Sequence, residues 1–357
     1  MRRARNKQKF RWKIRAIFPT LLLAFLLTGT TGYSFTALYV FGDSLSDTGN
    51  NPPTGSEASN YFNGRFSNGP LWVEYLSTNL GLRYVMSNNF AISGSTTAGL
   101  ALQVAKLPAS TNLNSALFTV VSPGNDFLEG ANMLGTTNSA WSNLVAGAVW
   151  NISNAVCTLY TNGAREVIVG NLVNIGLTPA FDGTPPGYSN YVDSQVASFN
   201  TLLATAVTNA MQSNSGLHIY LADNNLAFGI ILSNAAALGF TVTSIGAVDD
   251  PNLTNKSFTG PGADYVFWDP VHPTTKVHAL TAQAAYDLVA VGLKLGQTGT
   301  NLNLTITNLY PTLPYTIQSS TNLTAWSNYL TFTATNTNAV MAVTNKPGTK
   351  VYYRVGY

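Results

Sequence analysis

Short apolar runs alternate with helix-patterned segments over residues 38–295, and this alternation constrains the fold more than any other feature of the sequence. The runs are rich in Val, Ile, Leu or aromatic residues and end at polar turns, which is typical of buried strands. The predicted strands are Leu38–Phe41, Arg83–Met86, Leu117–Val121, Glu166–Val173 and Leu217–Leu221. Strands that alternate with helices predict an α/β domain built on a parallel sheet.

The segments between these runs carry apolar residues at spacings of three and four, which predicts helices with one face on the sheet. The clearest examples are Trp141–Tyr160 and Val192–Met211. A last helix is expected to begin at residues 273–275 and to run to about Leu295. Its predicted buried stripe is Val277, Leu280, Ala284, Leu288, Val291 and Leu295. His278 lies off that stripe, so we expect it to be solvated.

The first predicted strand leads into a polar turn that carries Ser44. Gly42 breaks the apolar run, and Asp43 and Ser44 follow it directly. Open α/β sheets bind ligands at the carboxyl ends of their strands, so a serine here is well placed to act as a nucleophile. The same pattern also describes an ordinary connection, and it does not assign a function by itself.

A second polar stretch, FWDPVHPT at Phe267–Thr274, supplies the groups that a nucleophilic serine needs. Asp269 and His272 are three residues apart, so they share a face of a tight turn, where the carboxylate can hold the imidazole in one tautomer. Serine, histidine and an orienting carboxylate are the parts required for acyl transfer.

With both stretches in view, the chain resembles the GDSL (SGNH) family of serine esterases and lipases. The GDSL motif stands intact at Gly42–Leu45, and the DxxH motif stands intact at Asp269–His272. Two further family blocks match Asn89–Thr97 (NFAISGSTT) and Ser122–Phe127 (SPGNDF). The resemblance implies a flavodoxin-like fold, a three-layer α/β/α sandwich with a parallel sheet.

The resemblance also assigns roles. Ser44 would be the nucleophile, His272 the general base and Asp269 its orienting acid. The oxyanion hole would comprise the backbone N–H groups of Ser44 and Gly94 and the side-chain amide of Asn125. Asp43 and Asp126 are interpreted as carboxylates that fix their loops. No cofactor and no metal site are implied.

One residue departs from the family pattern. Pro123 stands where the third block has a glycine, and proline fixes its own backbone and restricts the residue before it. We therefore expect the loop that presents Asn125 to be shifted, which would leave a slow enzyme.

The N-terminus is strongly basic and then apolar. Eight of the 18 Lys and Arg residues lie within the first 15 positions, and an apolar run follows at Ala16–Leu27. This pattern predicts a secretory signal over residues 1–37, because the apolar run is too short for a membrane anchor of about 20 residues. Without this segment 10 basic residues face 15 acidic ones, a net charge of −5, which argues against nucleic-acid binding.

The exported form would then be a bacterial protein that is secreted or held in the cell envelope, with no stable membrane span. Its catalytic domain is predicted at 38–296, and Gly296–Thr300 is interpreted as a linker. Residues 301–357 carry short alternating runs between Asn, Pro and Gly turns, which predicts a small all-β domain similar to a sandwich. They resemble a C-terminal β-module of secreted bacterial proteins, favoured as a stability module over a glycan-binding one.

These observations predict a secreted carboxylic-ester hydrolase, an esterase or lipase acting on a small-molecule or lipid ester. Two alternatives stay open: a phospholipase or polysaccharide deacetylase on the same triad, and a catalytically weak surface- or glycan-binding protein. Acyl preference is expected to depend on Gly99–Pro108 and Phe181–Tyr191, which follow the second block and a predicted strand.

Overall fold

The structure is a computed structural model of the 357-residue chain. It describes residues 35–108, 113–121, 123–136, 139–298, 301–307, 309, 314–336, 338–343 and 350–356. The predicted signal segment lies outside these residues except for its last three positions. No helix within the described ranges combines the length and the apolar character that crossing a membrane requires.

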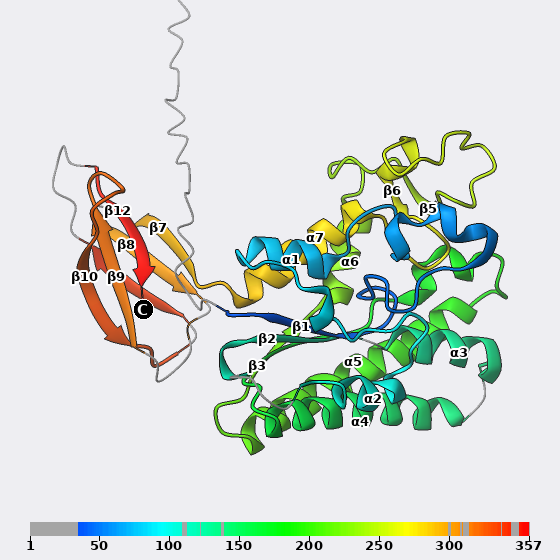
Figure 1. Cartoon of the computed structure of the whole chain (residues 1–357), viewed down its shortest axis with the longest axis horizontal. Helices are drawn as coiled ribbons and strands as arrows, with labels where there is room; N and C mark the ends of the chain where they lie inside the picture. The colour runs from blue at the N-terminus through cyan, green and yellow to red at the C-terminus, as the bar shows by residue number, and fades with distance from the viewer. Residues whose placement is uncertain are drawn as a thin grey trace, which may run out of the picture.

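A parallel sheet of four strands, in the order β1-β2-β3-β4, forms the centre of the larger domain (Figure 1). The strands are β1 (Leu38–Gly42), β2 (Leu117–Val121), β3 (Glu166–Gly170) and β4 (His218–Ala222). Leu38 pairs with Leu117, Leu117 with Glu166, and Glu166 with His218, so the strands begin and end in line. Their carboxyl ends therefore meet at one edge of the sheet.

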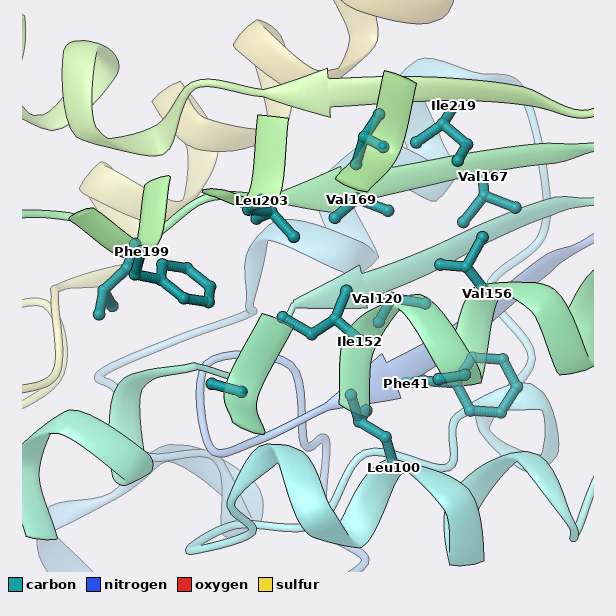
Figure 2. Packing of buried hydrophobic residues seen from close by; sticks show 14 of the residues in the cluster. Phe41, Leu100, Val120, Ile152, Val156, Val167, Val169, Phe199, Leu203 and Ile219 are labelled. Carbon is teal, nitrogen blue, oxygen red and sulfur yellow. The ribbon is translucent and has the colours of Figure 1, made fainter. Parts of the chain in front are cut away.

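Helices cover both faces of this sheet. On one face lie α2 (Leu100–Val104), α4 (Ala140–Thr161) and α5 (Tyr188–Ser213). Figure 2 shows the strand residues Phe41, Val120 and Val167 in one apolar cluster with Ile152 of α4 and Phe199 of α5. On the other face, α1 (Trp72–Asn79) and α7 (Thr275–Val289) pack against residues such as Val40 and Ile168. The predicted three-layer α/β/α sandwich is confirmed.

The remaining elements of the domain stand mostly at the carboxyl ends of the strands. They include α3 (Gly124–Leu134) after β2 and α6 (Asn224–Ser233) after β4. Short 3-10 helices occupy the loops: η1 (Gly55–Asn60), η2 (Phe62–Gly64), η3 (Met86–Asn88), η4 (Thr97–Gly99), η5 (Leu113–Ser115), η6 (Ile175–Leu177), η7 (Pro179–Phe181) and η8 (Pro261–Asp264).

Strand prediction was wrong in one place and incomplete in another. The predicted strand Arg83–Met86 is not a strand, because Val85 and Met86 are 42% and 50% exposed and Met86 begins η3. Only an isolated bridge from Asn89 to Val40 reaches the sheet there. Two short strands were missed, β5 (Val242–Gly246) and β6 (Tyr265–Phe267), which pair in parallel. They matter because β6 leads directly into Asp269.

The last helix also differs from its prediction. It ends at Val289 rather than near Leu295, and its buried residues are Val277, His278, Ala282, Ala285 and Val289. His278 is only 2% exposed, so the prediction that it is solvated was wrong. The reason is that the face of α7 on the sheet carries Ala282, Ala285 and Val289, and His278 lies one turn earlier on that face, whereas Val277 and Leu280 of the predicted stripe meet α6.

The C-terminal module contains two antiparallel sheets. One comprises β7 (Gly292–Thr298), β8 (Asn301–Thr307) and β11 (Ala339–Val343), and the other β9 (Pro314–Ser320), β10 (Ser327–Thr333) and β12 (Tyr352–Gly356). Leu304, Ile306, Tyr315 and Ile317 belong to its buried core, which confirms the predicted all-β module. The described part of the predicted linker Gly296–Thr300 is residues 296–298, which all belong to β7, so the module begins earlier than expected. Only residues 290 and 291 separate α7 from β7.

Candidate active site

The turn that carries Ser44 is fixed by a close approach of two strands. A Cβ atom on Gly42 would lie 2.3 Å from the carbonyl oxygen of Val121, so only glycine fits at the end of β1. The side chain of Gln103 bonds both the N–H and the C=O of Gly42, each at 2.8 Å. Asp43 Oδ1 accepts a bond from the N–H of Leu45 at 3.0 Å. Together these contacts hold Ser44 at the carboxyl edge of the sheet.

Ser44, His272 and Asp269 form a continuous chain of hydrogen bonds. Ser44 Oγ lies 2.7 Å from His272 Nε2, and His272 Nδ1 lies 2.7 Å from Asp269 Oδ2. Asp269 Oδ1 accepts bonds from the backbone N–H groups of Val271 at 3.0 Å and His272 at 2.8 Å. The structure therefore brings together the three residues predicted as a triad, although 225 or more positions separate Ser44 from the other two.

The carboxylate of Asp269 is strongly stabilised. Burial opposes its ionisation, but the His272 ring and the bonds from His272 and Val271 outweigh burial and lower the pKa of Asp269. An ionised Asp269 accepts a hydrogen bond from His272 Nδ1–H. Nε2 then carries no proton and can accept a hydrogen bond from the Ser44 hydroxyl. This is the arrangement that a general base requires.

Two aromatic residues that the sequence analysis did not assign to the site contact Asp269 and His272. Tyr61 Oη donates to Asp269 Oδ2 at 2.8 Å, and the ring of Phe66 lies 4.9 Å from that of His272. Burial, and then the Asp269 charge, raise the pKa of Tyr61, so its hydroxyl stays protonated as a donor. Both residues lie in the loop between β1 and α1, where the sequence shows only aromatic residues among polar ones.

The predicted oxyanion donors lie on one cleft with the triad. Ser44, Gly94, Asn125 and His272 all line a cleft of about 490 Å³. Gly94 has a φ of 80°, in the left-handed region that glycine tolerates. Asn125 Nδ2 donates to the carbonyl oxygen of Ser95 at 2.9 Å, and an amide nitrogen has a second hydrogen to offer a ligand.

Pro123 does not remove Asn125 from this cleft, contrary to our expectation of a shifted loop. It has φ −85° and ψ −9°, and it stands one residue ahead of α3, where its missing N–H breaks no helical bond. The start of α3 is tied to the loop of Gly94, because Asp126 accepts bonds from Thr97 N at 2.8 Å and Thr97 Oγ1 at 2.7 Å. Asp126 thus fixes its loop, as interpreted from the sequence.

Another buried carboxylate links the serine turn to the Gly94 loop. Asp47 is fully buried and accepts bonds from the backbone N–H groups of Asn50, Asn51 and Ser93 at 2.6, 3.0 and 2.7 Å. Asp43 is also buried, and burial raises the pKa of its carboxyl to about 6. Neither carboxylate bonds His272 in the described part of the chain, where Asp269 is the carboxylate that bonds its ring.

The wall of the cleft comes from segments other than those expected. One side is formed by the loop from Asn51 to Phe66, including Pro52, Pro53 and Tyr61. Among the described residues, neither Gly99–Pro108 nor Phe181–Tyr191 contributes to the lining. The loop after β1 therefore lines the cleft where we had expected Gly99–Pro108 and Phe181–Tyr191 to lie.

Comparison with known proteins places this geometry in context. The model of the family described as GDSL-like lipase/acylhydrolase matches residues 38–285. A GDSL esterase/lipase of Arabidopsis thaliana is 27% identical over 311 residues, which cover 70% of this chain and 81% of the relative. Acetylajmalan esterase 2 of Rauvolfia serpentina is 27% identical over 341 residues, covering 73% and 93%. The solved structure of the acetylxylan esterase Axe2 from Geobacillus stearothermophilus is 16% identical, covers 73% of this chain and 94% of its own, and gives a TM-score of 0.41.

Proposed function

This chain belongs to the GDSL-like lipase/acylhydrolase family and is an esterase of that type, and we propose that it cleaves carboxylic esters through an acyl-enzyme on Ser44. The observation that carries the proposal is the chain of hydrogen bonds from Ser44 Oγ through His272 to Asp269, with both links at 2.7 Å. A catalytically weak binding protein has no chemical need for this arrangement, so we do not favour that alternative.

In the first half of the reaction, Ser44 Oγ attacks the ester carbonyl carbon while its proton passes to His272 Nε2. The carbonyl π electrons move onto oxygen, and the resulting oxyanion meets the N–H groups of Ser44 and Gly94 and the amide of Asn125. When the carbonyl re-forms, the bond to the alcohol breaks, and His272 gives its proton to the departing oxygen. The product of this half is an acyl-serine.

Water then takes the place of the alcohol. His272 Nε2 accepts a proton from the water as its oxygen attacks the acyl carbon, and the same donors stabilise the second oxyanion. Collapse breaks the bond to Ser44 Oγ, which recovers the proton from His272, and the carboxylic acid leaves. Asp269 holds the ring and stabilises its charged form in both halves.

A direct comparison of rates on different esters can identify which class of ester the enzyme prefers. The relative named acetylajmalan esterase acts, by its name, on an acetyl ester, which makes acetyl esters the first substrates to test. Phospholipase and polysaccharide deacetylase activities use the same triad, so phosphatidylcholine and acetylated xylan belong in the same series.

We also propose that the protein is exported. Support comes from the basic start and the apolar run at Ala16–Leu27, followed by small and polar residues. Expression of the full chain in a bacterium, followed by N-terminal sequencing of the exported protein, tests this. A new N-terminus close to Ala37 agrees with export and cleavage, whereas a chain that is found only in the cytoplasm with Met1 intact contradicts the proposal.

The catalytic proposal is tested by hydrolysis of p-nitrophenyl esters from acetate to palmitate. We expect Ser44→Ala to lower kcat by roughly 10⁴-fold or more, because the nucleophile is lost. Ser46→Ala is the matched control, since its hydroxyl bonds the Trp72 ring nitrogen at 3.1 Å rather than His272. Activity that survives Ser44→Ala would reject the proposed nucleophile.

A further inference from the structure

A second cavity, of about 120 Å³, lies behind the catalytic cleft. It is enclosed by the sheet edge, α6, β6 and α7, and most of its lining side chains are apolar. Ile168, Phe228, Phe267 and Val277, which line it, are each no more than 8% exposed. The triad chemistry described above does not use this space.

The cavity adjoins the nucleophile. Asp43 and Leu45, the two neighbours of Ser44 in the chain, line both the cavity and the cleft. Val271, which precedes His272, also lines both. A group that is covalently attached to Ser44 Oγ therefore stands at the entrance of the cavity.

The size and character of the cavity indicate the kind of group that fits. An engineered apolar cavity of about 150 Å³ stays dry and binds benzene, so 120 Å³ suits a hydrocarbon of about four to six carbons. A fatty chain of a dozen or more carbons would not fit.

One polar atom, Nε2 of His278, stands in the mostly apolar wall, where it limits how well a hydrocarbon fits. His278 is 2% exposed, and its Nε2 has no hydrogen-bond partner in the described part of the chain. Burial, and then the neighbouring His272, lower the pKa of His278 to about 3, so the ring is neutral at the pH where an esterase works. The deep wall is thus uncharged, and the carboxyl of Asp43 lies beside Ser44 with one oxygen bonded to Leu45.

We propose that this cavity binds the acyl chain of the substrate, a chain of about four to six carbons, and sets the acyl preference of the enzyme. The inference rests on the proposed acyl-enzyme at Ser44. The acyl group stays on Ser44 after the alcohol has left, so it is the part of the ester that can occupy a space opening beside that residue. The alcohol departs before water attacks, and the open cleft gives it a path to solvent.

The test measures kcat/KM for p-nitrophenyl acetate, butyrate, hexanoate, decanoate and palmitate with the full-length protein. We expect the wild type to prefer butyrate or hexanoate. Ala227→Leu places three more carbons in the cavity, and we expect it to lower the hexanoate-to-acetate ratio by at least tenfold. The matched control is Leu226→Phe, next in sequence on α6 but 61% exposed and outside the lining, which should keep the wild-type ratio.

A second variant is expected to act in the opposite direction. His278→Leu removes the unpaired nitrogen that an alkyl chain cannot satisfy, so the hexanoate-to-acetate ratio should rise several-fold. A variant that merely folds poorly lowers both rates and does not produce this rise. A further series, the alkyl acetates from methyl to hexyl, varies the alcohol and keeps the acyl group constant. The dependence of kcat/KM on the length of the alcohol should not change in Ala227→Leu.

Each adverse result has a distinct meaning. A wild-type preference for acetate or for decanoate and longer chains, or a ratio that neither variant changes, overturns the acyl-pocket proposal while the esterase proposal stands. A response of the alkyl series instead of the acyl series assigns the cavity to the alcohol and also overturns it. If the wild type cleaves none of these esters, the proposed function fails and the inference fails with it.

Discussion

The loop before α7 carries His272 and the first turn of that helix carries His278, and the two histidines have opposite surroundings. His272 has a partner at each ring nitrogen, Asp269 at 2.7 Å and Ser44 at 2.7 Å. His278, six positions later, is more deeply buried and its Nε2 has no partner among the described residues. Burial without a carboxylate keeps an imidazole neutral, whereas an adjacent carboxylate stabilises the charged ring that forms during acyl transfer.

The largest expected effect comes from removing the carboxylate charge of Asp269, which His272 has as a partner and His278 lacks. Asp269→Asn should lower kcat by about 10³- to 10⁴-fold, because an amide neither stabilises the imidazolium nor fixes the correct tautomer. Steady-state kinetics on p-nitrophenyl butyrate measure the loss. Asp249→Asn is the control, since Asp249 is an exposed carboxylate close enough to be influenced by Asp269, and it should change kcat less than twofold. A loss below tenfold in Asp269→Asn would mean that the carboxylate is not what sets the two histidines apart.

A smaller effect concerns the free energy of unfolding, which should fall on acidification because the His278 ring is buried. The pKa of His278 is lowered in the folded state, so its contribution to stability is complete above pH 6.5 and is lost as pH falls toward 3. Between pH 7.5 and pH 5 this loss amounts to about 2 kcal/mol in the free energy of unfolding. His278→Leu should remove this part of the pH dependence, as measured by urea unfolding at both pH values.

Two neighbouring groups bear on that measurement. Asp43, whose pKa is raised to about 6, contributes stability below pH 3.8 that is lost as pH rises through 6, and it therefore acts in the opposite sense. His272 faces His278 as well. Because both groups are present in the wild type and the variant, the difference between the two proteins isolates His278. Unfolding free energies that fall in parallel down to pH 5 would contradict the prediction.

The smallest effect tests how far the surroundings of His272 extend. Tyr61→Phe removes one donor to Asp269 Oδ2, and we expect kcat/KM to fall about tenfold, since a hydrogen bond to a charged group contributes roughly 1.5–3 kcal/mol at most. Tyr75→Phe is the matched control, because its hydroxyl bonds Thr275 Oγ1 at 2.9 Å rather than Asp269. If both variants lose activity equally, the Tyr61 hydroxyl supports the fold and not the triad.

The sequence predicted the triad because the GDSL and DxxH motifs are each local and together resemble those of a known family. The motifs at Ser44 and at Asp269–His272 could therefore be matched without knowledge of how distant segments pack. Tyr61 and Phe66 have no such signature. Their contacts depend on how the loop after β1 folds over a turn that lies more than 200 residues away.

His278 and β7 show two other limits of sequence patterns. The predicted stripe followed Val277 and Leu280, which meet α6, but the face on the sheet carries Ala282 and Ala285 with His278 one turn earlier, and the apolar pattern does not include that histidine. Residues 292–298 form a strand because they pair with β8, a partner that follows them in the chain. Local periodicity does not distinguish such a segment from the end of a helix.

The short connection between α7 and β7 has a mechanical consequence. Two residues span at most about 7 Å, so β7 must begin within that distance of the end of α7. A long tether would let the catalytic domain sample a wide volume around any point that the module touches. A connection this short limits how far the cleft can travel from such a point.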